Sequence, residues 1–254
     1  SNPDEIVQVY QQSTGLPVHP RHPWIGELVY TAFSGSHQDA IRKCLLRQAP
    51  DEPWQVAYLP IDPRDLGRDY QAVIRVNSQS GKGGVAFVLE RDYGLALPRW
   101  LQVELAQIVQ RETETGSGEM QSERIHALFM QHFADTDHPS ALRGYRLQRD
   151  EGVDRIQADV EQGRKVISIQ GAGQGAIEAF VNAWQDTCGN QIHIVDYSEH
   201  ALGEGADAEA VAYVQLNIDG QRAAGAAFDQ DTVSASLRAL LAAINHAQQA
   251  RAAA

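Results

Sequence analysis

The chain has 254 residues, which is room for two or three domains of ordinary size, each with a core of its own. Its formal net charge of -12 argues against nucleic acid or an anionic membrane as a partner, because either would repel the chain and the sequence has no basic stripe. Cys44 and Cys188 lie far apart, which argues against a disulfide framework and predicts a reducing cytoplasm, and no apolar run approaches the roughly 20 residues that span a bilayer.

The first block, residues 1 to about 50, is predicted to be helical at 4–13 and again from about 36 to 47. Prolines at positions 17, 20 and 23 interrupt the stretch between these helices, since proline cannot continue a helix. The same prolines prevent His19 and His22 from lining one side of a helix, as zinc-binding histidines at this spacing usually do. We therefore predict no metal site there.

The second block, about 51 to 140, starts with the extended segment YLPIDP and continues with predicted helices near 83–90, 98–112 and 122–133. In the middle helix, apolar residues recur at helical spacing and Pro98 suits a first turn; they are Leu101, Leu105, Ile108 and Val109. The polar, proline-bearing segment 135–140 (DTDHPS) is predicted to be a linker.

The third block, about 141 to 254, contains an internal repeat. A displacement of 57 residues places Gly163 on Gly220, both hairpin-turn signals, and Trp184 on Leu241 in two amphipathic helices. The strands agree less well, because they alternate one step out of phase, which a one-residue difference in the turn or a bulge would explain; the positions are Ile156, Ala158 and Val160 against Ala212, Val214, Leu216 and Ile218. The predicted fold class is α+β, with helical linker subdomains followed by a duplicated strand-hairpin-helix domain.

The glycine-rich turn 171–175 (GAGQG) lies between a strand and a helix of the first repeat. Glycines there let the backbone approach a ligand, and the free amides of the helix N-terminus attract a carboxylate. A purely structural turn is the alternative, and no parallel unit surrounds it as a dinucleotide site requires. His193, Glu199 and His200 suggest a metal site, but lining or surface roles are more economical.

Several long segments, in this order, closely resemble the region that follows the catalytic barrel in 2-isopropylmalate synthases, and the resemblance continues to the C-terminus; they are LPVHPRHP, YTAFSGSHQDAI, YLPIDP and VIRVNSQSGKGGVAFVLE. The family condenses acetyl-CoA with 2-oxoisovalerate at the start of leucine biosynthesis. The resemblance implies linker subdomain I at 1–50, linker subdomain II at 51–140, a leucine-binding regulatory domain at 141–254, and a homodimer.

In that family a TIM barrel with an HxHN-type metal motif precedes this region, and nothing in the chain can supply it. The chain starts Ser1-Asn2 without Met, as an excised fragment would. The resemblance therefore places the divalent metal and most of the substrate pocket in the missing barrel. We expect this chain to hold no cofactor and to be inactive by itself.

The resemblance also nominates site residues. His37 and Tyr58 are expected to reach into the barrel of the other subunit as catalytic residues. The residues alone favour the alternative that His37 caps or decorates its helix and that Tyr58 is an ordinary half-buried aromatic. The expected leucine contacts are Gly173, Gln174, Gly175, Ile177, Glu178, Ile194, Tyr197, Ala201, Ala208 and Phe228.

Two departures from the family pattern bear on affinity and selectivity. Gln174-Gly175-Ala176 stands where many relatives have Asn-Gly-Pro, and Glu178 replaces a residue that is small in some of them. Two rival functions stay open. One is a stand-alone amino-acid-binding module, which needs neither His37 nor Tyr58. The other is the equivalent part of a citramalate or homocitrate synthase, with a different oxo acid and effector.

Overall fold

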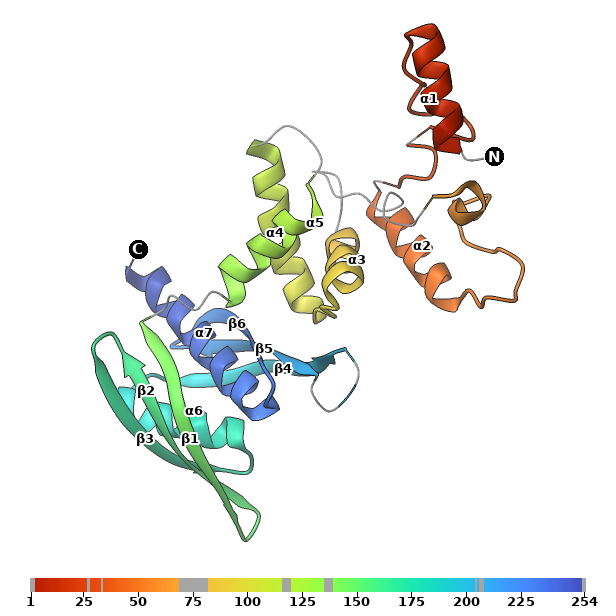
Figure 1. The fold of residues 1–254 in the computed structure, drawn as a ribbon. Helices are drawn as coiled ribbons and strands as arrows, with labels where there is room; N and C mark the ends of the chain where they lie inside the picture. Colours follow the sequence, from red (N-terminus) through yellow and green to blue (C-terminus); the bar gives the residue numbers. More distant parts are fainter. Residues whose placement is uncertain are drawn as a thin grey trace. The chain divides into compact units, whose positions relative to one another are not determined.

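The computed structural model describes residues 3–26, 28–32, 34–68, 82–115, 120–134, 139–203, 205 and 208–252. The chain divides into two compact units, Ser1–Tyr93 with Gln102–His126 and Gly94–Leu101 with Ala127–Ala254. Helices and two small antiparallel sheets make up these units (Figure 1), which confirms the predicted α+β class. The predicted boundaries of three domains stay a prediction, and residues 135–138 of the predicted linker lie outside the described residues.

The first unit is helical, and its helices lie close to the predicted ranges. Residues of α4 repeat at helical spacing as expected, with Leu105 and Val109 buried. Within the described part of the chain, no helix is long and apolar enough to cross a membrane. The helices are α1 (Pro3–Thr14), α2 (Gly35–Arg47), the 3-10 turn η1 (Pro63–Leu66), α3 (Lys82–Tyr93), α4 (Arg99–Thr115, in this unit from Gln102) and the start of α5 (Ser122–Phe129).

Helices α2 and α3 pack closely because one position on α3 has no side chain. A Cβ on Gly84 would lie 2.1 Å from Oε1 of Gln38, so any larger residue there would force the buried Gln38 side chain to move. Arg42 forms an ion pair with Glu90 at 2.7 Å across the same helices, and Ile41 between them is fully buried. These contacts fix the position of α2 against α3.

The second unit is built from two copies of a three-stranded antiparallel meander followed by a helix. The first copy has strand order β1-β2-β3 and the second β4-β5-β6. The predicted helix at 122–133 continues beyond α5 as a π-helical turn, η2 (Met130–Ala134), which precedes the first copy. The elements are β1 (Ser140–Asp150), β2 (Val153–Gln162), β3 (Lys165–Gly173) and α6 (Ala176–Cys188), then β4 (Ile192–Leu202), β5 (Glu209–Ile218), β6 (Gln221–Asp229) and α7 (Thr232–Ala252).

The two copies correspond at a displacement of 56, not 57. Strand β2 begins at Val153 and β5 at Glu209, 56 residues later. At this displacement Ile156, Ala158 and Val160 fall on Ala212, Val214 and Leu216, which all belong to the same buried hydrophobic cluster. The hairpin turn explains the extra step. Gly163 has φ +61 at the first loop position, whereas Asp219 and Gly220 have φ 52 and 87, as a type I′ turn requires, so the glycine is the second loop residue there.

Both copies also carry a bulge in the first strand. The register shifts between Leu142 and Gly144 in β1 and between Ile194 and Asp196 in β4, which are equivalent positions of the two strands. Gly144 lies at the bulge in β1, whereas the bulge in β4 has no glycine. A bulge changes which residues share a face of the sheet, and this matters for β4 below.

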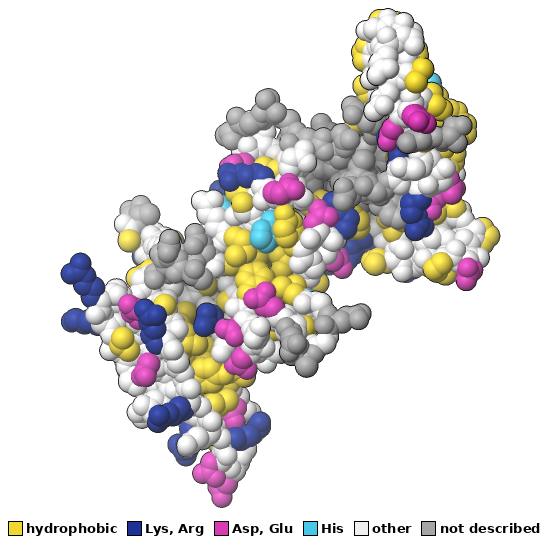
Figure 2. Space-filling model, in the orientation of Figure 1, with side chains coloured by type: hydrophobic (Ala, Val, Ile, Leu, Met, Phe, Trp, Pro, Cys, Tyr) yellow, Lys and Arg dark blue, Asp and Glu magenta, His cyan; other side chains and the backbone are white. Residues whose placement is uncertain are grey.

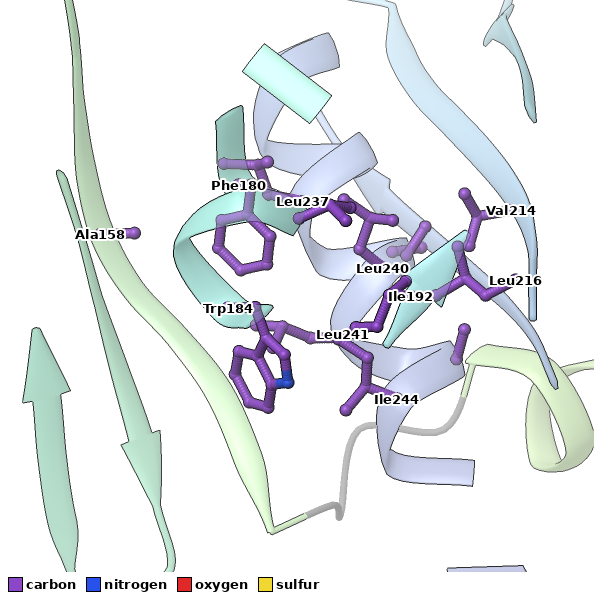
Figure 3. Close-up of a cluster of buried hydrophobic side chains, with 14 of the residues drawn as sticks. Ala158, Phe180, Trp184, Ile192, Val214, Leu216, Leu237, Leu240, Leu241 and Ile244 are labelled. Carbon is purple, nitrogen blue, oxygen red and sulfur yellow. The ribbon is translucent and has the colours of Figure 1, made fainter. Parts of the chain in front are cut away.

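The core of the second unit lies where α6 and α7 meet. Phe180 and Trp184 of α6 face Leu237 and Leu241 of α7 (Figure 3), and all four side chains are at most 2% exposed. Each helix covers the inner face of its own sheet, so the two copies share one hydrophobic cluster. Burial of these large side chains, each worth roughly 1.5–3 kcal/mol, is what joins them.

The outer faces of the two sheets differ. On β2 every second residue is exposed, and Lys and Arg are interspersed with Asp and Glu over the surface around β1–β3 that Figure 2 shows. On β5 both faces are buried, including Val211 and Tyr213 on the side away from α7. Phe129 covers that side, with its ring 6.4 Å from those of Tyr213 and Phe228. The second sheet is therefore enclosed by residues that precede the repeat.

Candidate functional site

His37 lies in the first turn of α2, on the exposed side. The neighbouring Gln38 is fully buried and donates a hydrogen bond from Nε2 to the backbone oxygen of Ala32 at 2.8 Å. One residue turned inward fixes the rotation of the helix, so the side chain of the residue before it is held toward solvent.

Tyr58 lies in a tight turn of the loop that follows α2. The N–H of Leu59 donates to the oxygen of Val56 at 3.2 Å, and Tyr58 between them has φ 64. Val56 and Leu59 are 5% and 3% exposed, whereas Tyr58 is 60% exposed. The turn is thus anchored on both sides in the core of the first unit and presents the phenol ring outward.

The two rings meet. The imidazole of His37 and the phenol of Tyr58 stack with centroids 4.1 Å apart and an interplanar angle of 28°. A non-glycine residue in the left-handed region costs of order 1–3 kcal/mol and persists where the surroundings hold it. An exposed, strained tyrosine stacked on an exposed histidine gives a proton-transfer group beside a hydrogen-bond donor.

The turn between β3 and α6 brings the strand end against its helix. A Cβ on Gly173 would lie 2.5 Å from the backbone nitrogen of Ala179, so this position needs glycine for packing. Gly175 is the N-cap residue of α6 and has open space around it, with nothing within 4 Å of a Cβ built there. Its exposed neighbour Gln174 donates its backbone N–H to Oε2 of Glu178 at 2.8 Å, so a carboxylate of the chain already occupies that amide.

The bulge in β4 places three of the predicted leucine contacts on one face of the sheet. Ile194 pairs with Leu216, Tyr197 with Val214 and Ala201 with Ala210, and these three β5 residues alternate along one face. Without the bulge, Ile194 and Tyr197, three positions apart, would point to opposite faces. Ile194 is 39% exposed and Ala201 is exposed, whereas Tyr197 is half-buried.

Tyr197 is held by two polar groups. Its hydroxyl lies 2.5 Å from Oε2 of Glu199, to which it donates, and 2.7 Å from Oγ of Ser236 on α7. Burial, and next the hydrogen bond to the Glu199 carboxylate, raise the pKa of Tyr197 to about 12. The phenol therefore stays protonated at all physiological pH values and is a fixed donor at this end of the strand.

Phe228 lies elsewhere. It pairs with Val211, on the face of the second sheet away from α7, where its ring contacts Phe129. Within one chain it is thus on the opposite face from the three β4 residues. Ile177 packs against the core of the unit, and Ala208 is half-buried just before β5. Among the residues that the structure describes, no hydrogen bond joins the turn 173–178 to the β4 residues.

A cavity of about 580 Å³ beside Phe228 was not predicted from the sequence. Its lining comes from four segments far apart in the chain, including Met130, Leu142, Arg238 and Asn245. The buried amide of Asn245 donates to the oxygen of Ser140 at 2.8 Å and accepts from its nitrogen at 3.1 Å, which ties the start of β1 to α7. The spacing of residues in the sequence does not predict that these segments come together.

The residues set aside as metal ligands have other contacts. His19 accepts the N–H of Arg21 at its Nδ1, 3.1 Å away, and the Nε2 of His200 lies 3.0 Å from the oxygen of Gly94. In the described ranges no group of three His, Cys, Asp or Glu side chains is placed to hold a metal ion. The described residues therefore offer no set of ligands for a divalent metal, which the family resemblance places in the barrel.

Comparison with known proteins gives two consecutive family matches. Residues 27–90 match the model described as alpha-isopropylmalate synthase, post-catalytic domain-like, and residues 119–248 match the LeuA allosteric (dimerisation) domain. Proteins named 2-isopropylmalate synthase are 47% identical over 248 residues in Azotobacter vinelandii (97% of this chain, 44% of the relative) and 46% identical over 260 residues in Pseudomonas fluorescens (100% and 46%). The chain spans less than half the length of these relatives.

Proposed function

The chain belongs to the 2-isopropylmalate synthase family, with its post-catalytic domain and its LeuA allosteric (dimerisation) domain, and from this premise we propose that it regulates and completes such an enzyme. The enzyme would be an acyltransferase that condenses acetyl-CoA with 2-oxoisovalerate. This portion would bind leucine as a feedback inhibitor, form the homodimer, and supply His37 and Tyr58 to the active site of a second chain. The setting we propose is the cytoplasm.

The observation that carries the regulatory part is the bulge in β4. It turns Ile194, Tyr197 and Ala201 to one face, where two apolar side chains suit an isobutyl group and the Tyr197 ring is held in place by its hydrogen bond to Glu199. The turn at Gly175, with open space around it, would supply the other side of the pocket. Because no hydrogen bond joins these two parts within the described chain, we propose that a two-fold pairing of regulatory domains brings them together, as closed homodimers do with self-complementary surfaces.

The stack of His37 on Tyr58 supports the active-site part. An imidazole can accept or deliver a proton, and the phenol can donate a hydrogen bond to an oxyanion. Both groups are exposed in the first unit, so they are available to a substrate held by another domain. The chain offers no metal cluster in its described part, and no step through a metal is assigned to its residues.

Thermal melting with amino acids tests the regulatory proposal. Leucine at about 100 times its dissociation constant should add roughly 2.7 kcal/mol to the stability of the unit that binds it, with less effect from isoleucine and valine. Gly175→Leu should abolish the shift, because the new side chain fills the open space at the turn. Gly144→Leu is the matched control, since a Cβ on Gly144 also meets nothing within 4 Å but lies on β1, away from the proposed pocket.

Three results would contradict the proposal in different ways. A larger shift with isoleucine than with leucine would point to the equivalent part of a citramalate synthase. A leucine shift that survives Gly175→Leu would move the site away from the turn. No shift with any of the three amino acids, in a sample shown to be dimeric by sedimentation, would remove the sensor function.

A further inference from the structure

The loop that carries Tyr58 has to return along the whole of α2. His37 lies in the first turn of this helix and Gln48 is its C-cap, so at 1.5 Å per residue the two are about 16 Å apart. Between Gln48 and Asp62 the chain forms no helix or strand. A loop of this length samples many conformations, and the stack on His37 requires one of them.

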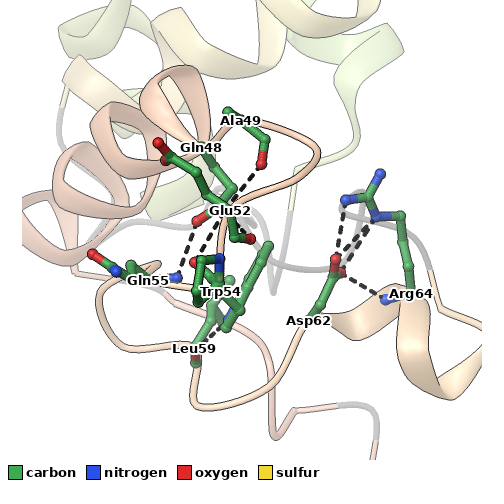
Figure 4. A network of polar contacts seen from close by, with 9 residues as sticks. Gln48, Ala49, Glu52, Trp54, Gln55, Leu59, Asp62 and Arg64 are labelled. Carbon is green, nitrogen blue, oxygen red and sulfur yellow. Dashed lines mark hydrogen bonds and ion pairs between the residues drawn. The ribbon is translucent and has the colours of Figure 1, made fainter.

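Gln48 holds the first half of the loop (Figure 4). Its side-chain Nε2 donates to the backbone oxygens of Ala49, Glu52 and Pro53 at 3.2, 3.1 and 3.2 Å, and its Oε1 accepts the N–H of Gln55 at 3.0 Å. One amide side chain thus satisfies several backbone groups of the loop and fixes the loop to the end of the helix.

Trp54 closes the second half. Its indole Nε1 donates to the backbone oxygen of Leu59 at 2.7 Å (Figure 4). This bond bridges the four residues between Trp54 and Leu59, and Tyr58 is one of them. The turn places Tyr58 in the left-handed region, a position where glycine or asparagine is normally found. Such strain persists only when the surroundings over-determine the conformation. The Trp54 bond spans the strained residue, as does the shorter loop closed by the Leu59 N–H and the Val56 oxygen.

We infer that Trp54 is a positioning residue for the His37–Tyr58 pair, and that Gln48 holds in place the loop segment 49–55, which contains Trp54. The inference rests on the proposed role of that pair. We assign Trp54 no contact with a substrate or a reacting atom. Its role is to hold the Tyr58 turn in the one conformation that stacks the phenol on the imidazole.

The test follows the stack itself by NMR of the chain with 13C-labelled histidine. A stacked phenol displaces the ring-proton signal of His37 upfield, and His37→Gln assigns that signal. The difference between the unchanged chain and Tyr58→Leu measures the full displacement. Trp54→Phe, which keeps an aromatic ring but removes the N–H donor, should lose more than half of it. Trp24→Phe, at a site 54% exposed, is the matched control and should lose almost none.

A double-variant cycle separates positioning from a direct effect of the indole. In the Tyr58→Leu background, Trp54→Phe should leave the His37 signal where it is. Gln48→Met, which keeps the length of the side chain without its hydrogen bonds, should lose a smaller part of the displacement. This variant decides the question if Trp54→Phe unfolds the first unit.

Retention of the full displacement in a folded Trp54→Phe chain, or in a folded Gln48→Met chain where Trp54→Phe is unfolded, would overturn the inference. An equal signal change in the Tyr58→Leu background would overturn it too, because the indole would then act directly. Leucine does not enter this measurement. A failed leucine titration therefore leaves the inference standing, and a failed stack measurement leaves the leucine proposal untouched.

Discussion

Asp219 shows how a single exposed carboxylate can hold a turn. It occupies the first loop position of the β5–β6 hairpin and accepts hydrogen bonds from the N–H of Gln191 at 2.8 Å, from Asn190 at 3.0 Å and from Arg251 at 2.8 Å. These bonds, the backbone one first, lower the pKa of Asp219 to about 2. The turn, the start of β4 and the end of α7 are thus joined at one side chain.

The sign of the pH dependence follows from that shift. A carboxyl whose pKa is lower in the folded chain stabilises it above the unfolded pKa, near 4, and this stabilisation is lost as the pH falls toward 2. Asp219→Asn keeps a residue that tolerates φ 52, removes the charge and replaces one oxygen that accepts from Asn190 and Arg251 by an NH2 donor. We expect its melting temperature to be lower than that of the unchanged chain at pH 7, and the two to converge between pH 4 and pH 2.

Asp186→Asn is the control for this comparison, since it removes an exposed carboxylate from α6 of the same unit. Its melting curve should follow that of the unchanged chain throughout. A constant gap between Asp219→Asn and the unchanged chain down to pH 2 would show that the charge of Asp219 contributes nothing to stability.

Among the elements, the two sheet–helix pairs use the same device. Gly171 on β3 lies against α6, and Gly225 on β6 lies against α7. A Cβ at these positions would come within 2.5 Å of Ala179 oxygen and within 2.3 Å of Ala239 oxygen, respectively. Backbone atoms cannot move aside as a flexible side chain can, so each helix lies closer to its sheet than any other residue would allow.

Gly225→Ala should therefore lower the free energy of unfolding by about 2 kcal/mol, in the range typical of overpacked cores. Urea denaturation of the second unit measures this. Gly144→Ala on β1 is the matched control, because a Cβ there meets nothing within 4 Å and alanine is the better strand residue. Equal stability of the Gly225→Ala and Gly144→Ala chains would disprove the close approach.

The sequence predicted most of the elements, for reasons that can be named. Apolar residues at helical spacing predicted α4, and turn glycines after alternating strands predicted the duplicated half. The displacement was one residue too long because it aligned Gly163 with Gly220, which occupy different positions of two turn types. The bulge in β1 lies beside Gly144, but the bulge in β4 has no glycine, so which β4 residues share a face could not be predicted from the sequence.

For the candidate site, the family resemblance named His37 and Tyr58, but the pattern of residues did not predict that their rings would stack. The path of the loop between them depends on side-chain bonds of Gln48 and Trp54 to backbone oxygens. Such bonds depend on three-dimensional closure and leave no periodicity in the chain. The leucine contacts remain a prediction from the resemblance.

At the scale of the whole chain, the second unit is not confined to the repeat. Its second sheet is covered by Phe129, which precedes the repeat, and His200 of β4 contacts the backbone of Gly94. Leu95 and Leu97 of that earlier segment are 1% and 5% exposed. A domain cut at residue 141 would lack these residues.

Phe129→Ala should consequently destabilise the second unit by about 3 kcal/mol, as truncation of a buried phenylalanine usually does. Urea denaturation followed by circular dichroism gives the value. Val166→Ala, at a residue 62% exposed on the outer face of the first sheet, should change stability by less than about 0.5 kcal/mol. A Phe129→Ala cost as small as that of Val166→Ala would mean that the repeat is self-sufficient.

The enclosure of the second sheet has a consequence for the order in which the chain is made. Phe129 leaves the ribosome before the strands that it covers, and 100 residues separate it from the last residue of β6, Asp229. At about 5–20 residues per second, this aromatic side chain waits roughly 5–20 s for its partner surface. During that interval the nascent chain presents an apolar surface that only its own later segment can cover, and a chaperone that recognises such surfaces would have its binding site there.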